Sequence, residues 1–219
     1  MSGLNKLAEV KIPRCFIGDV ESDNDISIHA LCDASQVAYA TVIFVRVQRG
    51  ERVSVHFVQA KNRVAPTVYK KLDGRKSIPR LELLAANIGA RLTKSVLDAL
   101  NLKVKVYYWS DSTTVLAWIE RECHWDVFVG NRVKEIRALT ESQQWRYVPG
   151  SLNPADLPSR GCSVDQFVES KWWEGPAWLS KNRDEWPATE FNVDESAVNM
   201  GLRKGAIKDS NTCSSIYLS

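Results

Sequence analysis

The spacing of apolar positions predicts three consecutive strands in the first third of the chain. Residues 26–33 carry apolar side chains at every second position, which is the period of a half-buried strand. Residues 37–47 ("VAYATVIFVRV") are rich in β-branched and aromatic side chains, and the turn "QRGER" leads from them into a third apolar stretch at residues 53–60. Because short connections join antiparallel neighbours, we expect a three-stranded antiparallel meander.

From Pro79 onward the apolar period changes to that of a helix. Apolar side chains recur three, four and seven positions apart as far as about residue 100, at Leu81, Leu84, Ala85, Ile88, Leu92 and Val96. Proline is well tolerated in the first turn of a helix, so we expect the helix to begin near Pro79. The later pattern predicts a strand at 104–109, helices at 112–121 and 125–139, a short strand at 144–148, and a last helix from Asn153. The predicted order, β-β-β-α-β-α-α-β-α, is typical of an α/β protein.

Composition divides the chain into three parts. Residues 1–25 are an irregular lead-in, residues 26–170 hold all the predicted elements, and residues 171–219 form a Trp-rich stretch ("KWWEGPAWL") followed by a polar tail that we expect to be a linker or disordered. With 44% hydrophobic and 25% charged residues, the 219-residue chain resembles an ordinary globular protein. No apolar run approaches the roughly 20 residues of a membrane span, so we expect no membrane association.

The five cysteines argue for an intracellular protein. They are odd in number and widely spaced, and none forms a CxxC pair. This pattern indicates reduced thiols rather than a disulfide framework or a zinc site.

Four acidic residues lie at predicted strand ends or helix starts, and each has an ordinary structural explanation. Asp33 ends the first strand, and Glu82 falls in the expected first turn of the long helix, where the helix dipole favours an acid. Asp111 or Ser110 could cap the helix that follows the fourth strand. Asp156 would be the third residue of the last helix, where the dipole again favours an acid. No single one of these acids indicates a function.

Taken together, the four acids favour a metal site. The first and fourth strands are the most apolar, so we expect them to be central, adjacent and parallel, with Asp33 and Asp111 at the carboxyl ends where ligands bind. Small residues at positions 86, 89 and 90 would let the long helix approach the sheet and bring Glu82 to the same place. Crowded carboxylates raise one another's pKa unless a cation intervenes, and oxygen ligands select Mg²⁺ or Mn²⁺. Two such ions would suit displacement at a phosphodiester.

Seven blocks around these acids resemble, in order and spacing, the ribonuclease H-like domain of BEL/Pao-type LTR retrotransposon polyproteins, also described as the Pao retrotransposon peptidase family region. The resemblance covers about residues 12–179. The blocks are "HALCDAS", "AKNRVAP", "SIPRLELLAA", "WSDSTTVLAWI", "FVGNRVKEI", "NPADLPSRG" and "WWEGPAWL".

The resemblance implies a ribonuclease H-like fold, with a mixed five-stranded sheet flanked by helices, and a D-E-D-D metal cluster. Asp33, Glu82, Asp111 and Asp156 match the four acids, which would hold two Mg²⁺ or Mn²⁺ ions. The implied reaction is hydrolysis of the RNA strand of an RNA/DNA hybrid during reverse transcription, and the hybrid would be recognised by its shape, phosphates and 2′-hydroxyls.

A basic segment supplies candidate phosphate contacts. Residues 61–80 contain seven basic residues against one acid, Asp73. A solvated basic loop is the plain interpretation, and a phosphate-contacting segment is the functional one. Given the resemblance, Lys61, Arg63 and Arg80 are candidates for nucleic-acid binding.

One departure from the family pattern concerns turnover. Related domains often carry a histidine shortly before the last acidic motif, where it assists product release, but this chain has Tyr147 at the matching position. Tyrosine, with a reference pKa of about 10, is a poor proton shuttle near neutral pH. Two interpretations stay open: catalysis is slowed, or position 147 is simply an amphipathic strand residue.

Three other functions compete with that of a hybrid-specific endoribonuclease. A catalytically idle module that binds nucleic acid or spaces a polyprotein agrees with Tyr147, although all four acids argue against it. An integrase or transposase core should place its helical acid after the second strand acid, whereas Glu82 precedes Asp111. An aspartic peptidase needs Asp-Thr/Ser-Gly, and neither "DAS" nor "DST" continues with glycine.

The surroundings expected of such a domain are incomplete in this sequence. It has neither an Asp-Asp pair like that of a polymerase nor a His/Cys set like the zinc module of an integrase. We therefore expect a polyprotein fragment or a host-retained remnant, whose lead-in is the end of a polymerase-connection region. Reverse transcriptase and integrase regions of the same polyprotein are the expected partners. The expected location is the cytoplasm, in a virus-like particle, or the nucleus.

Overall fold

A computed structural model describes residues 6–8, 10–12, 25–67, 74–101, 103–187 and 191–203, and leaves the side chains of residues 74–77 undescribed. Most of the expected lead-in therefore lies outside the described residues, as do the side chains of Lys70, Lys71, Asp73, Arg75 and Lys76 in the basic segment.

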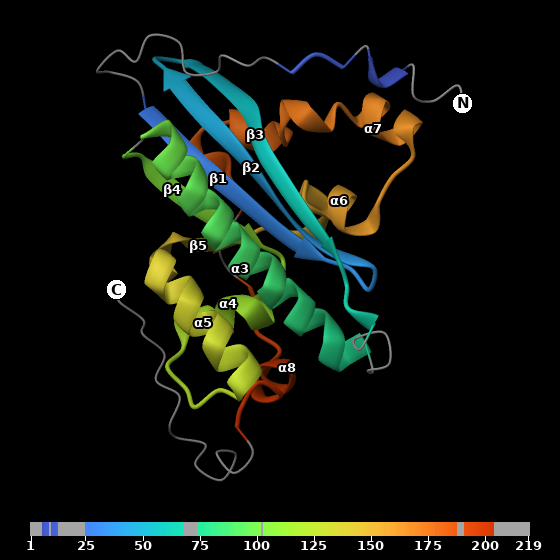
Figure 1. Ribbon diagram of the computed structural model, residues 1–219. Coiled ribbons are helices and arrows are strands. Elements are labelled where there is room, and N and C mark those ends of the chain that lie inside the picture. Colours follow the sequence, from blue (N-terminus) through green and yellow to red (C-terminus); the bar gives the residue numbers. More distant parts are fainter. Residues whose placement is uncertain are drawn as a thin grey trace.

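Five strands form one mixed sheet in the order β3-β2-β1-β4-β5 (Figure 1). The first three strands make the expected antiparallel meander, whereas β4 pairs in parallel with β1 and β5 in parallel with β4. The predicted mixed five-stranded α/β architecture is therefore confirmed. The strands are β1 (Asp25–Ala34), β2 (Ala38–Arg49), β3 (Arg52–Val64), β4 (Lys105–Ser110) and β5 (Trp145–Tyr147).

Helices connect and cover the strands. The long helix α3 lies across the near face of the sheet in Figure 1, with α4 and α5 beside it. The helices are α3 (Gly74–Leu100), α4 (Thr113–Glu120), α5 (Val127–Leu139), α6 (Asp156–Arg160), α7 (Val164–Ser170) and α8 (Glu195–Asn199). Short 3₁₀ turns are η1 (Ser142–Gln144), η2 (Gly150–Leu152), η3 (Trp172–Glu174), η4 (Ala177–Ser180) and η5 (Arg183–Glu185).

Two predicted helix starts are wrong. Helix α3 begins at Gly74, so Pro79 is its sixth residue rather than part of its first turn. The absent proline N–H removes one intrahelical hydrogen bond there, a loss that the packing of the helix on the sheet must outweigh. Helix α6 begins at Asp156 rather than at Asn153, because residues 154 and 155 form a turn first.

Helix α3 lies unusually close to the sheet. A side chain at Gly89 would come within 2.6 Å of the Cys32 sulfur, so only glycine permits this approach. Nearby, the Thr41 hydroxyl donates a hydrogen bond of 2.9 Å to the backbone carbonyl of Ala85, which ties β2 to the helix. The expectation that small residues bring this helix onto the strands is confirmed.

A second apolar cluster covers the opposite face of the sheet. Its strand residues, which include Leu31, Phe44 and Trp109, are fully buried. The cover comes from the chain that follows α7, through Trp178, Leu179 and Trp186. We name residues 172–187, which contain η3, η4 and η5, the strap; its orange segments lie behind the sheet in Figure 1.

Buried Arg46 holds the strap in place. Its guanidinium donates hydrogen bonds to the backbone carbonyls of Leu179, at 3.0 Å, and Lys181, at 3.1 Å, and it lies over the Trp186 ring. A buried guanidinium is tolerated when it is hydrogen-bonded, and with a third bond of 3.0 Å from Nη1 to the Gln48 side chain each of its three nitrogens donates. A 2.5 Å ion pair between Arg183 and Asp25 fastens the end of the strap to the start of β1.

The expectation of a disordered tail does not hold for its described part. Beyond the strap, α8 packs on α4 and α3: the Trp118 indole donates to the Val198 carbonyl at 3.0 Å, and Arg121 binds Glu195 through two hydrogen bonds. Leu202 also forms a bridge with Trp125, which therefore precedes α5 instead of belonging to it. The proposed domain boundary at residue 170 stays a prediction, but contacts of the fold cross it.

The cysteines agree only in part with the expectation of reduced thiols. Cys32 and Cys162 are free, whereas Cys123 is disulfide-bonded. Within the described part of the chain, no helix has the length and apolarity needed to cross a bilayer.

The strap predicts a stability difference between two truncations. A chain ended after Ser170 exposes the far sheet face, and we expect it to be roughly 6 kcal/mol less stable than a chain ended after Arg203, at about 2 kcal/mol for each of the three buried side chains that are lost. Thermal unfolding and binding of a hydrophobic dye measure this. Equal stability of the two truncations would contradict a structural role for the strap.

Candidate metal centre

The parallel pairing of β1 with β4 brings two acids to one place. Cys32 is level with Ser110 in this pair, so Asp33 and Asp111 follow at the same end of neighbouring central strands. Asp33 is buried, with 5% of its surface exposed, and Asp111 is half-buried. The expected central, adjacent and parallel arrangement of these two strands is confirmed.

Asp111 does not cap the helix that follows it. The N-cap of α4 is Ser112, whose hydroxyl accepts a 3.3 Å hydrogen bond from the Val115 amide. The Ser110 hydroxyl accepts from the Ser112 amide instead of capping the helix. The ordinary explanation for the position of Asp111 is therefore wrong, and its carboxylate is left to face the site.

Glu82 reaches the same region from inside α3. It is the ninth residue of the helix, and no acid lies in the first turn, so the helix-dipole explanation for Glu82 is wrong. The close approach of α3 to the sheet brings its carboxylate near those of Asp33 and Asp111, whose charges both act on it. The Ser112 side chain gives Glu82 a hydrogen bond.

Asp156 stands at the rim of the site. It opens α6, its side chain is 42% exposed, and it forms an ion pair with Arg160 one turn later. Its charge acts on both Asp33 and Asp111. The four acids thus gather at one end of the sheet, where Asp33 is buried and Glu82, Asp111 and Asp156 are partly exposed.

Two polar residues that the sequence analysis did not assign hold these acids. Ser159 donates its hydroxyl to Asp33 across 126 positions of sequence. Asn153 is buried and donates to the Cys32 carbonyl at 2.9 Å and, more weakly, to the Asp111 carboxylate at 3.5 Å. The only signal in the sequence was their position beside Asp156 in "NPADLPSRG", which also fits a plain helix start.

Crowding and burial raise the pKa values of the core acids. Burial raises the pKa of Glu82 to about 8, and the charges of Asp111 and Asp33 add to the effect. Burial also raises the pKa of Asp111 to about 7, with the Asp33 charge as the next cause. The pKa of Asp33 rises for the same reason, although the hydrogen bond from Ser159 opposes the rise.

The side chains suit a hard divalent cation, although the acids are not arranged in a complete coordination geometry. All the ligands are carboxylate oxygens, which Mg²⁺ and Mn²⁺ prefer, and a cation would relieve the repulsion that raises the pKa values. Among the described residues, however, no group of three or more His, Cys, Asp or Glu side chains is placed so that it could hold a metal ion. Ser159 and Arg160 currently engage two of the four carboxylates.

Tyr147 is placed as a packing residue. It pairs with Ser110 at the end of β5, and its ring lies 5.4 Å from that of Phe191 and against the core on the helix side of the sheet. These contacts favour the interpretation of position 147 as a strand residue.

His29 does not take the place of the histidine that assists product release in related domains. It is fully buried on β1, where Trp109 donates to its Nδ1 at 3.2 Å and its Nε2 lies 3.0 Å from the Ser27 hydroxyl. Burial lowers the pKa of His29 well below its usual value. The ring therefore stays neutral and belongs to the core.

The candidate basic residues differ in their surroundings. Lys61 and Arg63 are exposed at the end of β3, whereas Arg80 is bound to Asp126, the N-cap of α5, by a 2.7 Å ion pair. Nucleic-acid binding by these three residues stays a prediction.

A comparison with protein families identifies this fold. The sequence model of the Pao retrotransposon-like RNaseH-like domain matches residues 1–112, about half of the chain. The chain belongs to this family. The match contains Asp33, Glu82 and Asp111 and ends one residue later, so Asp156 lies outside it. No curated protein matches the chain. The suspected Pao-type relationship is therefore confirmed.

The raised pKa values predict how pH acts on the metal-free Pao-type domain. A carboxyl group whose pKa is higher in the folded state than its unfolded value near 4 binds its proton more tightly when folded, so stability falls as pH rises from about 4 towards 8. Asp111→Asn removes one such group. We expect this variant to unfold about 2–4 °C above the wild type near pH 8 in EDTA, as a gain of about 1 kcal/mol would give.

Thermal unfolding across this pH range, with Asp184→Asn as the control at an exposed acid, measures the effect. Below about pH 3 the advantage of Asp111→Asn should vanish, because the wild-type carboxyl group is then largely protonated in both states. A wild type whose stability does not fall between the two pH values would contradict the crowding of these acids.

Proposed function

We propose that this Pao-type domain is an endoribonuclease that hydrolyses the RNA strand of RNA/DNA hybrids during reverse transcription. The observation that carries the proposal is the gathering of Asp33, Glu82 and Asp111, from three separate elements, at the carboxyl end of the central strand pair. Membership of a ribonuclease H-like family supports it.

The four acids would hold the ions. Asp33, Glu82, Asp111 and Asp156 are the proposed ligands of two Mg²⁺ or Mn²⁺ ions, which when bound lower the pKa of water and stabilise charge on the phosphate and on the leaving 3′ oxygen. Asp156 is ion-paired with Arg160, so it would bind a metal ion only after its carboxylate has left the arginine.

Neighbouring residues orient these ligands without neutralising them. Ser159 fixes Asp33, Asn153 links Asp111 to the end of β1, and Ser112 bonds Glu82. All three are neutral donors, so the negative charge that attracts a cation is preserved. Outer partners of this kind commonly tune metal affinity by 10–100-fold.

The proposed substrate is recognised by shape and backbone. A-form-like duplexes expose phosphates and 2′-hydroxyls rather than readable base edges. Lys61 and Arg63 are the proposed phosphate contacts, and Arg80 contributes less because Asp126 already binds it. Reverse transcriptase and integrase regions are the proposed partners, and a virus-like particle in the cytoplasm, or the nucleus, is the proposed location.

A second candidate function is an idle module that binds nucleic acid without cleaving it. One observation favours it: Arg160 occupies Asp156, and the described carboxylates do not form a group that could hold a metal ion. Tyr147, which packs on Phe191, offers no help with turnover.

A hybrid-cleavage assay distinguishes the two functions. Purified wild-type protein should cleave the RNA strand of a labelled RNA/DNA hybrid in Mg²⁺ or Mn²⁺ but not in EDTA. We expect Asp111→Asn to lower the rate by more than about a hundredfold, because even the loss of an outer partner of a metal ligand costs 10–100-fold.

The control is Asp184→Asn, at an exposed acid in the strap, which should cleave like the wild type. A folded wild type that binds the hybrid but shows no metal-dependent cleavage would support the idle module instead.

Arg160 predicts a change in metal affinity that does not depend on catalysis. Because its guanidinium competes for Asp156, Arg160→Ala should bind Mn²⁺ more tightly, by up to about fivefold, as an exposed ion pair worth at most about 1 kcal/mol allows. Isothermal titration with Mn²⁺ measures this, and Arg160→Lys should lie between the two proteins. An unchanged or weaker affinity of Arg160→Ala would show that the arginine does not compete.

A further inference from the structure

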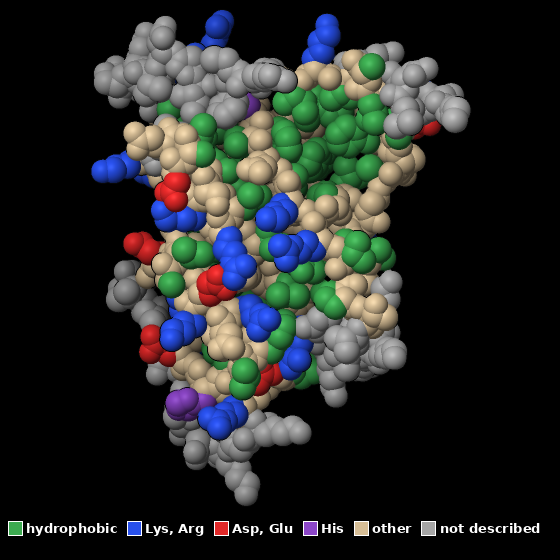
Figure 2. Space-filling view, viewed as in Figure 1, with side chains coloured by type: hydrophobic (Ala, Val, Ile, Leu, Met, Phe, Trp, Pro, Cys, Tyr) green, Lys and Arg blue, Asp and Glu red, His purple; other side chains and the backbone are tan. Residues whose placement is uncertain are grey.

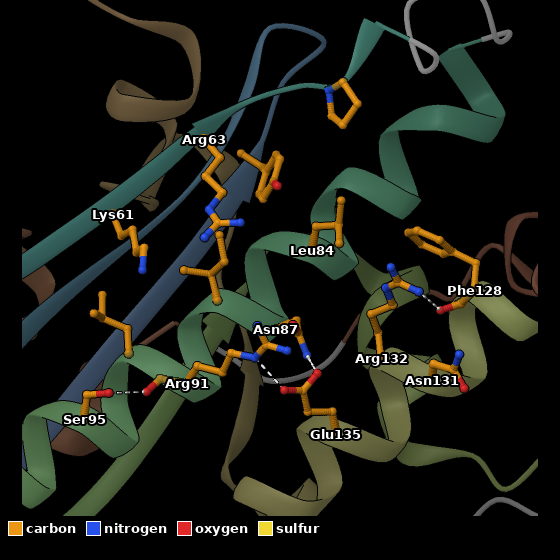
Figure 3. Close-up of a pocket in the computed structure, with 14 residues that line it drawn as sticks. Lys61, Arg63, Leu84, Asn87, Arg91, Ser95, Phe128, Asn131, Arg132 and Glu135 are labelled. Carbon is orange, nitrogen blue, oxygen red and sulfur yellow. Dashed lines mark hydrogen bonds and ion pairs between the residues drawn. The ribbon is translucent and has the colours of Figure 1, made fainter.

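A groove lies on the helix side of the sheet, starts beside the four candidate acids and extends away from them. Its volume is about 470 Å³, and it runs between the end of β3, the outer side of α3 and the start of α5 (Figure 3). Along α3 it extends from Leu84 to Ser95, which is about 16 Å at 1.5 Å per residue.

Basic side chains line both banks of the groove. Lys61 and Arg63 project from β3, and the guanidinium carbon of Arg132 from α5 lies over the Phe128 ring, 4.1 Å from its centroid. In Figure 2, which has the viewpoint of Figure 1, basic side chains gather across the face that α3 and α5 form. The groove therefore concentrates positive charge along one line.

Most of this charge is not neutralised within the protein. No acid in the described part of the chain forms an ion pair with Lys61, Arg63 or Arg132. The acid of the groove, Glu135, is already taken by Arg91 at 2.5 Å and by Asn87 at 3.1 Å. Four cations in the lining, Lys61, Arg63, Arg91 and Arg132, stand against one acid, Glu135, whose charge Arg91 and Arg132 share, and this net positive charge favours an anionic ligand.

The groove begins beside the carboxylates and leads away from them. In the sheet, Asp33 is level with Ala40, and Ala40 with Asn62, which lies between Lys61 and Arg63. Two strand spacings separate Asp33 from this position, about 10 Å. On α3, the groove starts two residues after Glu82.

We propose that this groove binds the sugar-phosphate backbone of one strand of the nucleic acid, on the stretch that flanks the carboxylates. The inference rests on the proposed function for the identity of the ligand. At about 3.4 Å of duplex axis per nucleotide, 16 Å accommodates about five nucleotides of one strand. The groove thus holds the substrate in register, while the acids act on a different phosphate.

The side chains favour a polynucleotide over an acidic peptide. Both arginines present planar guanidinium groups, which bind phosphate through two hydrogen bonds, and Arg132 is stiffened by its aromatic neighbour. The basic residues spread along the groove, as evenly spaced phosphates require.

Binding in EDTA tests the proposal without relying on cleavage. The ligand is a fluorescent RNA/DNA hybrid, and the variant is Lys61→Ala/Arg63→Ala/Arg132→Ala. We expect binding to weaken by roughly tenfold or more, and the slope of log K against log salt to become shallower by about 3, since each lost phosphate contact removes about 0.9.

The matched control removes equal charge from the other end of the same sheet, as Arg49→Ala/Arg52→Ala/Lys105→Ala, and should keep the affinity of the wild type. If circular dichroism shows that the triple variant is misfolded, the double variant Lys61→Ala/Arg63→Ala, which leaves α5 intact, replaces it. Its slope of log K against log salt should still become shallower by about 2.

Three outcomes would overturn the proposal: a groove variant with wild-type affinity and slope, a control variant that loses as much binding, or polyglutamate that competes as well as single-stranded DNA. If the wild type cleaves the hybrid but the groove variant binds it as well as the wild type does, the groove proposal is wrong and the proposed nuclease activity stands. If the groove variant loses binding but the wild type does not cleave the hybrid, the proposed nuclease activity is wrong and the groove proposal stands.

Discussion

The parallel pairing of β1 with β4 is the constraint on which the rest of this structure depends. Both strands lie at the centre of the sheet with one face against the helices and the other against the strap. A shift of register by one residue would exchange the side chains of the two faces, so the pairing is held by the whole core. Asp33 and Asp111 consequently meet at a fixed place, whatever their repulsion costs.

The protein answers that repulsion with neutral hydrogen-bond donors rather than with buried cations. Ser159, Asn153 and Ser112 hold the core acids, and the cation at the site, Arg160, is an exposed residue of a five-residue helix. A lysine or arginine buried among the acids would stabilise the fold but would also fill the site. The arrangement gives the acids hydrogen bonds but leaves their negative charge without a buried cation, which is costly for folding and useful for ligand binding.

Much of the sheet could be predicted from the sequence because its signals are local. The period of two in β1, and the apolar β4 that ends just before Asp111, identify the central pair and two of the acids. Glu82 was placed wrongly because Pro79 is a strong start signal, which the packing of α3 overrides. The roles of Ser159 and Asn153 cannot be predicted from local patterns, because Asp33 and the Cys32 carbonyl, to which they donate, lie more than a hundred positions away in sequence.

The strap was missed for a related reason. Its tryptophans show no regular period, and their burial depends on a sheet face that is completed only by tertiary contacts. The sequence predicts only part of the basic groove, namely Lys61 and Arg63. Arg132 joins them because α5 packs beside α3. Local patterns thus identify elements, whereas sites assembled from several elements need the fold.

The strap also determines when this domain can finish folding. The ion pair between Arg183 and Asp25 joins positions 158 apart. The backbone carbonyls that accept hydrogen bonds from Arg46 lie more than 130 residues later in the chain. During synthesis the meander is complete long before its second apolar face can be covered, and such long-range closure is slow. For that interval a nascent chain exposes Phe44 and Leu31, so a polyprotein that carries this domain gains from sequences or chaperones that shield the sheet until the strap has emerged.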